Sequence, residues 1–221
     1  MNSMKRARLV VLISGGGTNL QAVLDACAAD RLAADVVAVF SNKRRAFGLA
    51  RAERAGVATV YVPKKAFMRQ GHSRDDYDAD VARQVAEYRP DIVVLAGWMH
   101  VLSPSFLGLF PRRVINLHPA LPGEFAGTHA IERAYEAWRS GTIERSGVMV
   151  HEVIPEVDAG APIAVAEVPF EPDDTLDSFE SRVHATEHKL LVHAIAAHWR
   201  ALQSLQVTAA DSAASNVKQG P

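Results

Sequence analysis

The chain has 221 residues, of which 48% are hydrophobic, enough for one globular domain with a full core. Its 24 Lys and Arg residues balance its 25 Asp and Glu residues, and the formal net charge of −1 excludes the basic excess typical of proteins that bind nucleic acid unaided. The single cysteine excludes an intrachain disulfide and a cysteine metal cluster, and the first apolar run, residues 9–13, is too short for a signal-peptide core or a bilayer span.

From residue 9 onward, short apolar runs alternate with segments of helical spacing. The runs predict strands at residues 9–13, 36–40, 57–62, 92–96 and 114–117. The segments between them predict helices at residues 20–29, 46–55 and 74–88. Strands that are apolar throughout and alternate with helices indicate a parallel sheet covered on both faces.

After residue 145 the pattern changes. Two apolar runs, 148–153 and 163–168, flank a polar turn at 155–160, which predicts a hairpin joined to the sheet. A long helix is predicted from residue 175 to about 202, preceded by acidic residues that suit a helix N-terminus. The predicted fold is therefore α/β, a Rossmann-like, mostly parallel sheet with helices on both faces, a C-terminal antiparallel hairpin and a long C-terminal helix.

Further predictions concern the domain limits, the start of the chain, and its location and partners. Residues 1–205 are predicted to form one domain, and the small, polar residues 206–221 are predicted to be a disordered tail. Either Met1 or Met4 is a possible start. We expect a cytoplasmic monomer or homodimer whose partners are small molecules, without nucleic acid or membrane.

Polar residues gather where three of the predicted strands end, at residues 14–19, 97–102 and 116–128. In an open α/β sheet, ligands bind beyond the carboxyl ends of the strands. The first segment, SGGGTN, leads into a helix, so its backbone amides could bind a phosphate. It could equally be a tight turn in which Thr18 or Asn19 caps the helix. A P-loop is excluded because no Gly-Lys-Ser/Thr follows, and the third glycine of a dinucleotide fingerprint is missing.

Two further polar groups could carry chemistry. Asn116 and His118 alternate along a strand end and project to the same side, which suits polarising a carbonyl and moving a proton. Asp158, in the hairpin turn, would favour the imidazolium form of His118 and raise its pKa if it lay alongside. Taken singly, each is also compatible with ordinary loop and turn chemistry.

Residues 184–188 (HATEH) match the H-x-x-E-H pattern of one class of zinc proteases. Both histidines lie one helical turn apart, so they could bridge a metal. No third ligand follows at a suitable spacing, and we expect no metal.

In combination, six stretches resemble the folate-dependent formyltransferase family, most closely its glycinamide ribonucleotide branch. They follow the family's order over residues 9–200, and the joint occurrence of N-x-H-P with a downstream D-x-G is specific. The stretches are VVLISGGGTNLQAVLDAC (10–27), VAVFSNKRRAFGLARAERAGVAT (37–59), DIVVLAGWMHVLSP (91–104), INLHPALPG (115–123), VHEVIPEVDAGAPI (150–163) and ESRVHATEHKLL (180–191).

The resemblance implies an enzyme of purine biosynthesis. It would transfer the formyl group of 10-formyltetrahydrofolate to the amine of 5'-phosphoribosylglycinamide without a metal. The implied catalytic residues are Asn116, His118 and Asp158. The implied ribonucleotide-binding residues are Gly17, Thr18, Asn19 and Glu187. The implied folate-binding residues are Arg74, Met99, His100, Val101 and Leu102.

The same resemblance implies a mechanism. The amine attacks the formyl carbon, and Asn116 with protonated His118 stabilises the negative charge on the formyl oxygen. Asp158 keeps His118 charged and helps to order a water that moves the proton.

The chain departs from the family pattern at three places. Residues 120–127 (ALPGEFAG) differ from the S-L-L-P of many relatives, and His100 stands where an arginine is common. A third departure is the run of extra residues at 68–72, just before Arg74.

Three alternatives share part of this pattern. Methionyl-tRNA formyltransferase shares the trio but is expected to carry an added C-terminal RNA-binding domain. Formyltetrahydrofolate deformylase is expected to carry an N-terminal regulatory domain, whereas the first strand here is predicted at residue 9. A non-catalytic nucleotide- or folate-binding module would not need the intact trio.

Overall fold

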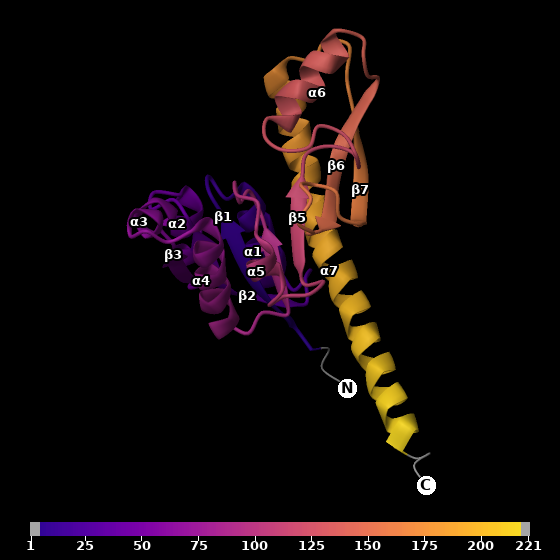
Figure 1. Cartoon of the computed structure of the whole chain (residues 1–221). Coiled ribbons are helices and arrows are strands. Elements are labelled where there is room, and N and C mark those ends of the chain that lie inside the picture. The colour runs from indigo at the N-terminus through magenta and orange to yellow at the C-terminus, as the bar shows by residue number, and fades with distance from the viewer. Residues whose placement is uncertain (1–4, 218–221) are drawn as a thin grey trace.

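The computed structural model describes the backbone of residues 5–217 and the side chains of residues 5–205. In this part of the chain, one seven-stranded sheet lies between two layers of helices (Figure 1). The strands are β1 (Ala7–Ile13), β2 (Ala34–Ser41), β3 (Ala58–Tyr61), β4 (Ile92–Leu95), β5 (Val114–His118), β6 (Arg145–Glu152) and β7 (Pro162–Pro169). The helices are α1 (Thr18–Ala28), α2 (Phe47–Arg54), α3 (Lys64–Arg69), α4 (Arg74–Glu87), α5 (Pro104–Leu107), α6 (Ala130–Arg139) and α7 (Leu176–Val217).

The strand order is β3-β2-β1-β4-β5-β6-β7. Strands β1 to β5 are parallel, whereas β6 and β7 run antiparallel to their neighbours. The predicted α/β fold, with its hairpin and long C-terminal helix, is confirmed. The order reverses between β1 and β4, and a crevice for ligands is expected at the carboxyl ends of these strands.

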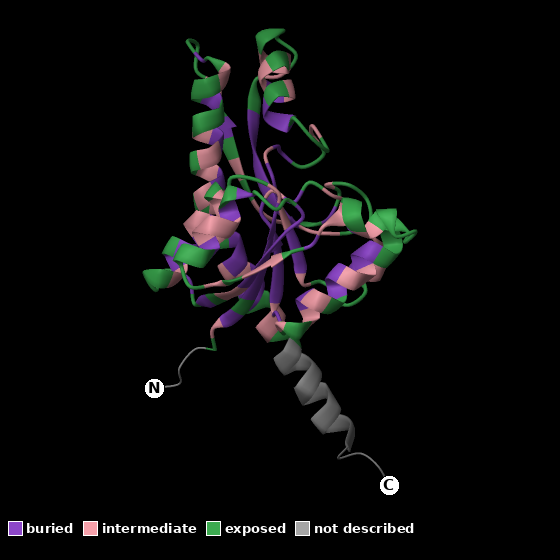
Figure 2. Cartoon of the chain, turned by 90° about the vertical axis from the view of Figure 1, so that its left-hand side faces the viewer, coloured by how far each residue is buried: buried purple, intermediate pink, exposed green. Residues whose placement is uncertain are grey.

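Strand β1 shows why the sheet must be covered on both sides. Leu9, Val11 and Ile13 pack into one core with α1 and α7. Val10 and Leu12, which alternate with them, pack into the other core with α4 and α5. Figure 2 shows the result, a buried sheet inside helices whose outer faces are exposed. Burial of both strand faces explains the uninterrupted apolar run in the sequence.

Strand β5 extends further than β4, and this creates a step in the sheet. The last residue of β4, Leu95, pairs with Asn116, whereas β5 continues to His118. Beyond Asn116, β5 pairs with β6, where His118 lies opposite Met149, and with no other strand of the described residues. The step leaves the side chains at the end of β5 facing the space beyond β4.

Three helices were not predicted, and their sequences explain why. Helices α3 and α5 have only six and four residues. Helix α6 has ten residues, but it begins after His129 in the left-handed conformation, without a side-chain cap, so the usual start signal is missing.

Helix α7 extends beyond the predicted end near residue 202, to Val217. Its backbone therefore enters the segment predicted to be a disordered tail, of which residues 218–221 lie outside the described residues. The domain limit at residue 205 stays a prediction. None of the described helices combines the length and apolar character needed to cross a membrane.

Candidate active site

In the glycine turn between β1 and α1, the backbone at Gly17 packs closely against the backbone of α2. Gly17 caps α1 with a φ of 71°, and no side chain caps the helix, so the interpretation of Thr18 or Asn19 as the cap is wrong. A Cβ atom on Gly17 would lie 2.6 Å from Cα of Gly48 in α2, which only glycine avoids. The first turn of α1 contains no acidic residue. Its free amides and positive helix end can accept an anion.

Two side chains from distant elements meet beside this turn. Asn19 Nδ2 donates to Glu187 Oε2 at 3.1 Å, and His184 Nδ1 donates to the same oxygen at 2.7 Å. Glu187 is buried, and its hydrogen bond raises the pKa of His184. Within the described residues, no group of three or more His, Cys, Asp or Glu could hold a metal ion. Within the H-x-x-E-H segment, Glu187 therefore accepts hydrogen bonds from His184 and from Asn19 of α1.

The residues Asn116, His118 and Asp158 converge, although two lie on β5 and one in the hairpin turn. Asn116 Nδ2 donates to Asp158 Oδ1 at 3.1 Å. His118 Nδ1 lies 3.4 Å from Asp158 Oδ2. His118 is only 4% exposed, and its other ring nitrogen, Nε2, forms no hydrogen bond with the described residues. One imidazole nitrogen is therefore directed at a carboxylate, and the other is left to meet a ligand.

Two groups that sequence reasoning missed complete this cluster. His151 on β6 is buried, and its Nε2 lies 3.2 Å from Asn116 Nδ2, while its Nδ1 donates to the Glu152 carbonyl at 2.8 Å. The amide of Gly127 donates to Asp158 Oδ2 at 2.8 Å. The pairing of β5 with β6 places Asn116 opposite His151, a register that the hairpin prediction could have revealed. The Gly127 contact had no sequence signal, since it is made by the backbone.

Burial and the Asp158 carboxylate act on the pKa of His118 in opposite directions. Asp158 raises this pKa, as expected, but burial lowers it by more, because desolvation of the imidazolium outweighs the ion pair. That Asp158 keeps the ring charged during the reaction stays a prediction. Burial by itself would raise the pKa of Asp158, but the nearby His151 ring and the hydrogen bond from the Gly127 amide together outweigh burial and lower it.

A single cleft of about 520 Å³ connects these groups. It is lined by the trio, by His151, by Asn19, His184 and Glu187 at one side, and by Met99, His100, Val101 and Leu102. The last segment is fixed to the glycine turn, because the Met99 amide donates to Ser14 Oγ at 3.0 Å and the Ser14 amide to the Gly97 carbonyl at 2.9 Å. Met99 and Val101 are exposed apolar side chains in the cleft.

Arg74 and Thr18 are the predicted site residues with the weakest connection to this cleft. Neither lines it, although Arg74 donates a hydrogen bond to the Val101 carbonyl and lies 4.0 Å from Asp78. Arg74 therefore supports the segment 99–102 from behind. Gly17, like Thr18, lies next to the cleft rather than in its wall.

The hairpin turn between β6 and β7 has no room for a side chain at Gly160. Replacement of Gly160 by alanine is therefore expected to destabilise the protein by about 2 kcal/mol or more. A Cβ atom here would lie 1.7 Å from the Glu152 carbonyl oxygen and 3.2 Å from His151 Nδ1, so the turn that holds Asp158 must move. Urea unfolding of Gly160→Ala measures the loss, with Ala159→Ser as the exposed neighbouring control. Equal stability of the two variants would contradict this prediction.

Known proteins are similar to this chain over most of its length. The formyl transferase family model matches residues 7–195. The chain is 47% identical over 197 residues to phosphoribosylglycinamide formyltransferase of Schizosaccharomyces pombe, covering 86% of this chain and 95% of that protein. It is 43% identical over 182 residues to the Escherichia coli protein of the same name, covering 82% of each. The crystal structure of glycinamide ribonucleotide transformylase 1 from Symbiobacterium toebii superposes with a TM-score of 0.81 at 38% identity, covering 88% of each chain.

Proposed function

The chain belongs to the formyl transferase family, and from this premise we propose that it transfers the formyl group of 10-formyltetrahydrofolate to the amine of 5'-phosphoribosylglycinamide. The products are formylglycinamide ribonucleotide and tetrahydrofolate. The observation that carries the proposal is one cleft that joins Asn19, next to the anion-accepting turn, with an apolar segment and the Asn116–His118–Asp158 cluster.

The two substrates are assigned to opposite sides of the cluster. The ribonucleotide phosphate would bind at the amides of the glycine turn, with Asn19 and Glu187 facing the rest of that substrate. The flat ring system of the folate would lie with its faces along Met99, Val101 and Leu102. This arrangement brings the amine and the formyl carbon together at His118, and holding two reactants in line supplies a large part of a rate enhancement.

His118 and Asn116 would stabilise the formyl oxygen once the amine has attacked. The Nε2 of His118, which has no hydrogen-bond partner among the described residues, would donate to this oxygen once the ring is protonated. Both hydrogens of Asn116 Nδ2 face partners in the ligand-free protein, His151 Nε2 and Asp158 Oδ1, so Asn116 would exchange one of them for the oxygen. Hydrogen-bond donors held beside a developing negative charge have large effects on rate.

Asp158 is assigned two tasks. Its carboxylate faces His118 Nδ1, so it favours proton uptake by that ring as the formyl oxygen becomes negative. It would also help to order a water that moves a proton from the attacking nitrogen to the leaving nitrogen of the folate. In balance, a C–N bond to the acceptor forms, the C–N bond to the folate breaks, and the amine proton ends on the folate nitrogen.

A spectrophotometric assay tests the proposal directly. The purified protein is mixed with 10-formyltetrahydrofolate, and release of the folate product is followed with and without phosphoribosylglycinamide. We expect release that depends on the acceptor. Release that is equal without the acceptor would indicate a deformylase, and the absence of release in both arms would reject the proposal.

A further inference from the structure

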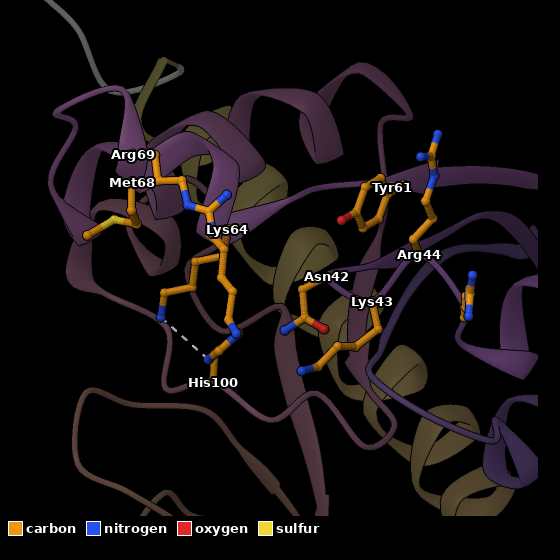
Figure 3. A pocket seen from close by; sticks show the side chains of 10 residues that line it. Asn42, Lys43, Arg44, Tyr61, Lys64, Met68, Arg69 and His100 are labelled. Carbon is orange, nitrogen blue, oxygen red and sulfur yellow. Dashed lines mark hydrogen bonds between the residues drawn. The ribbon is translucent and has the colours of Figure 1, made fainter.

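The arginines of the chain are used in different ways. Arg182 pairs with the Asp174 carboxylate. Arg44 and Arg69 line a second cavity, of about 770 Å³, beside the cleft (Figure 3). Arg133, on α6, lines neither of these cavities and forms no ion pair with a carboxylate of the described residues. Its guanidinium is directed at main-chain carbonyl groups instead.

Arg133 fastens the loop that precedes α6. Its Nη2 donates to the carbonyls of Phe125 and Ala126, the second at 2.8 Å, and its Nε donates to the His129 carbonyl at 3.4 Å. The guanidinium also lies over the Phe125 ring, with its central carbon 5.8 Å from the ring centre. A single planar group on a helix therefore holds both ends of the loop segment 125–129.

The position of Arg133 is unfavourable unless these contacts compensate for it. The N-terminus of a helix carries partial positive charge, which repels a cation. Arg133 lies one turn into α6, and its guanidinium reaches back to the His129 carbonyl at the start of the helix. A neutral side chain would avoid this repulsion, so the loop carbonyls account for the presence of a cation here.

The loop segment 125–129 is strained and needs to be held. Phe125 and His129 adopt the left-handed conformation, with φ of 44° and 58°, which is uncommon for residues other than glycine. Such residues persist where the surrounding structure fixes them, and they gather at functional sites. Arg133 bonds the carbonyls of both residues. The segment is therefore kept in one arrangement by a side chain outside the cleft.

The held segment contacts two of the residues to which catalysis is assigned. The Gly127 amide donates to Asp158 Oδ2 at 2.8 Å. The main-chain carbonyls of Glu124 and Phe125 raise the pKa of His118, in opposition to burial. The arrangement of the loop backbone therefore acts on both members of the carboxylate–imidazole pair.

One peptide group connects Arg133 to Asp158. The carbonyl of Ala126 and the amide of Gly127 belong to the same planar unit, whose oxygen accepts from the guanidinium and whose N–H donates to the carboxylate. Because the unit is planar, fixing the direction of the oxygen also fixes the direction of the N–H. A hydrogen bond to the oxygen also polarises the N–H and strengthens it as a donor.

We propose that Arg133 is a positioning residue for formyl transfer: it orients the Ala126–Gly127 peptide group, whose N–H holds the Asp158 carboxylate facing His118. The inference rests on the function proposed above. Arg133 touches neither substrate in this assignment, because it lies outside the cleft. Its loss therefore acts through Asp158, and this gives it a signature that a purely structural role lacks.

Replacement of Arg133 by methionine removes the guanidinium donors and keeps an unbranched side chain beside Phe125. We expect kcat for formyl transfer to fall about tenfold, the size of one lost hydrogen bond to a charged group. Arg133→Lys keeps the charge but not the planar fork, and kcat should fall about threefold. Arg139→Met removes an exposed arginine from the other end of α6 and should leave kcat unchanged.

A double-mutant cycle with Asp158→Ala distinguishes positioning from a general loss of structure. Without a carboxylate, the Gly127 amide has nothing to hold, so adding Arg133→Met should lower kcat by less than about twofold. A general loss of structure would lower kcat by the same factor in both backgrounds. Equal factors, or an unchanged kcat in Arg133→Met alone, would overturn the inference.

Amide hydrogen exchange, followed by NMR, tests the contact without turnover. In Arg133→Met we expect exchange at Gly127 to accelerate at least about tenfold more than at Val11, a buried strand residue that reports global unfolding. Where the methionine variant is too unstable to study, Arg133→Lys should show the same selectivity at about threefold. Equal acceleration at both amides, or none at Gly127, would reject the inference.

The two measurements also separate this inference from the proposed function. Selective acceleration at Gly127 in a protein that transfers no formyl group supports the contact and rejects the function alone. Formyl transfer with equal factors in the cycle and unchanged exchange at Gly127 rejects the positioning role and leaves the function standing.

Discussion

Replacement of His118 by alanine is expected to lower kcat for formyl transfer by about 10²–10⁴-fold, with the KM values of both substrates changing much less. The reason is the position of the ring: Nδ1 faces Asp158, and Nε2 is the unpartnered nitrogen at the end of β5. Its contribution is needed when charge develops on the formyl oxygen, so its loss affects the chemical step. Steady-state kinetics with each substrate varied in turn measures the effect.

Because His118 is buried, its removal also leaves a cavity, and stability must be measured alongside. His118→Gln keeps more of the volume and should still fold if the alanine variant does not. His193→Ala, an exposed histidine on α7, is the matched control and should retain full activity. A folded His118→Gln protein with near-normal kcat would remove His118 from the mechanism.

Replacement of Asp158 by asparagine is expected to lower kcat by about 10²-fold or more and to change the pH dependence. In the unmodified protein, burial lowers the pKa of His118 and Asp158 partly restores it. Without the carboxylate charge, the pKa of His118 falls further. Since protonated His118 is lost as the pH rises through its pKa, the limb that depends on this form should move to lower pH, and activity at pH 8 should fall more than at pH 6.

Rate profiles from pH 5 to pH 9 for the two proteins test this shift. Glu136→Gln, an exposed acid on α6, removes one charge elsewhere and should leave the profile unchanged. A profile for Asp158→Asn that is lower but has the same shape would show that Asp158 acts only by holding the turn. A limb displaced to higher pH would contradict the assigned electrostatics.

The sheet was predictable because its strands are buried on both faces. Val10 and Leu12 face one core while Leu9, Val11 and Ile13 face the other, so the sequence shows the strand as one apolar run. The hairpin was predictable from its polar turn. Helix α6 was not, because His129 supplies no recognisable start, and α3 and α5 are too short to show a period.

The convergence of Asn116, His118 and Asp158 was predicted through the resemblance, and the structure brings them together. What could not be predicted is the balance of effects on His118. Sequence spacing indicates that a carboxylate is near, but the amount of water excluded from the ring depends on the packing of segments far apart in the chain, and burial here exceeds the effect of Asp158. The catalytic roles themselves stay predictions until the variants are assayed.

The amide of Gly127 that holds Asp158 has a consequence for how the loop at 120–127 can evolve. A main-chain N–H is supplied by every amino acid except proline, so the loop needs the right conformation rather than a particular set of side chains. Gly127 itself, at a φ of 86°, is constrained, whereas exposed neighbours such as Pro122 and Ala126 can be exchanged without touching the carboxylate. Homologues can therefore diverge in this loop while keeping the same anchor.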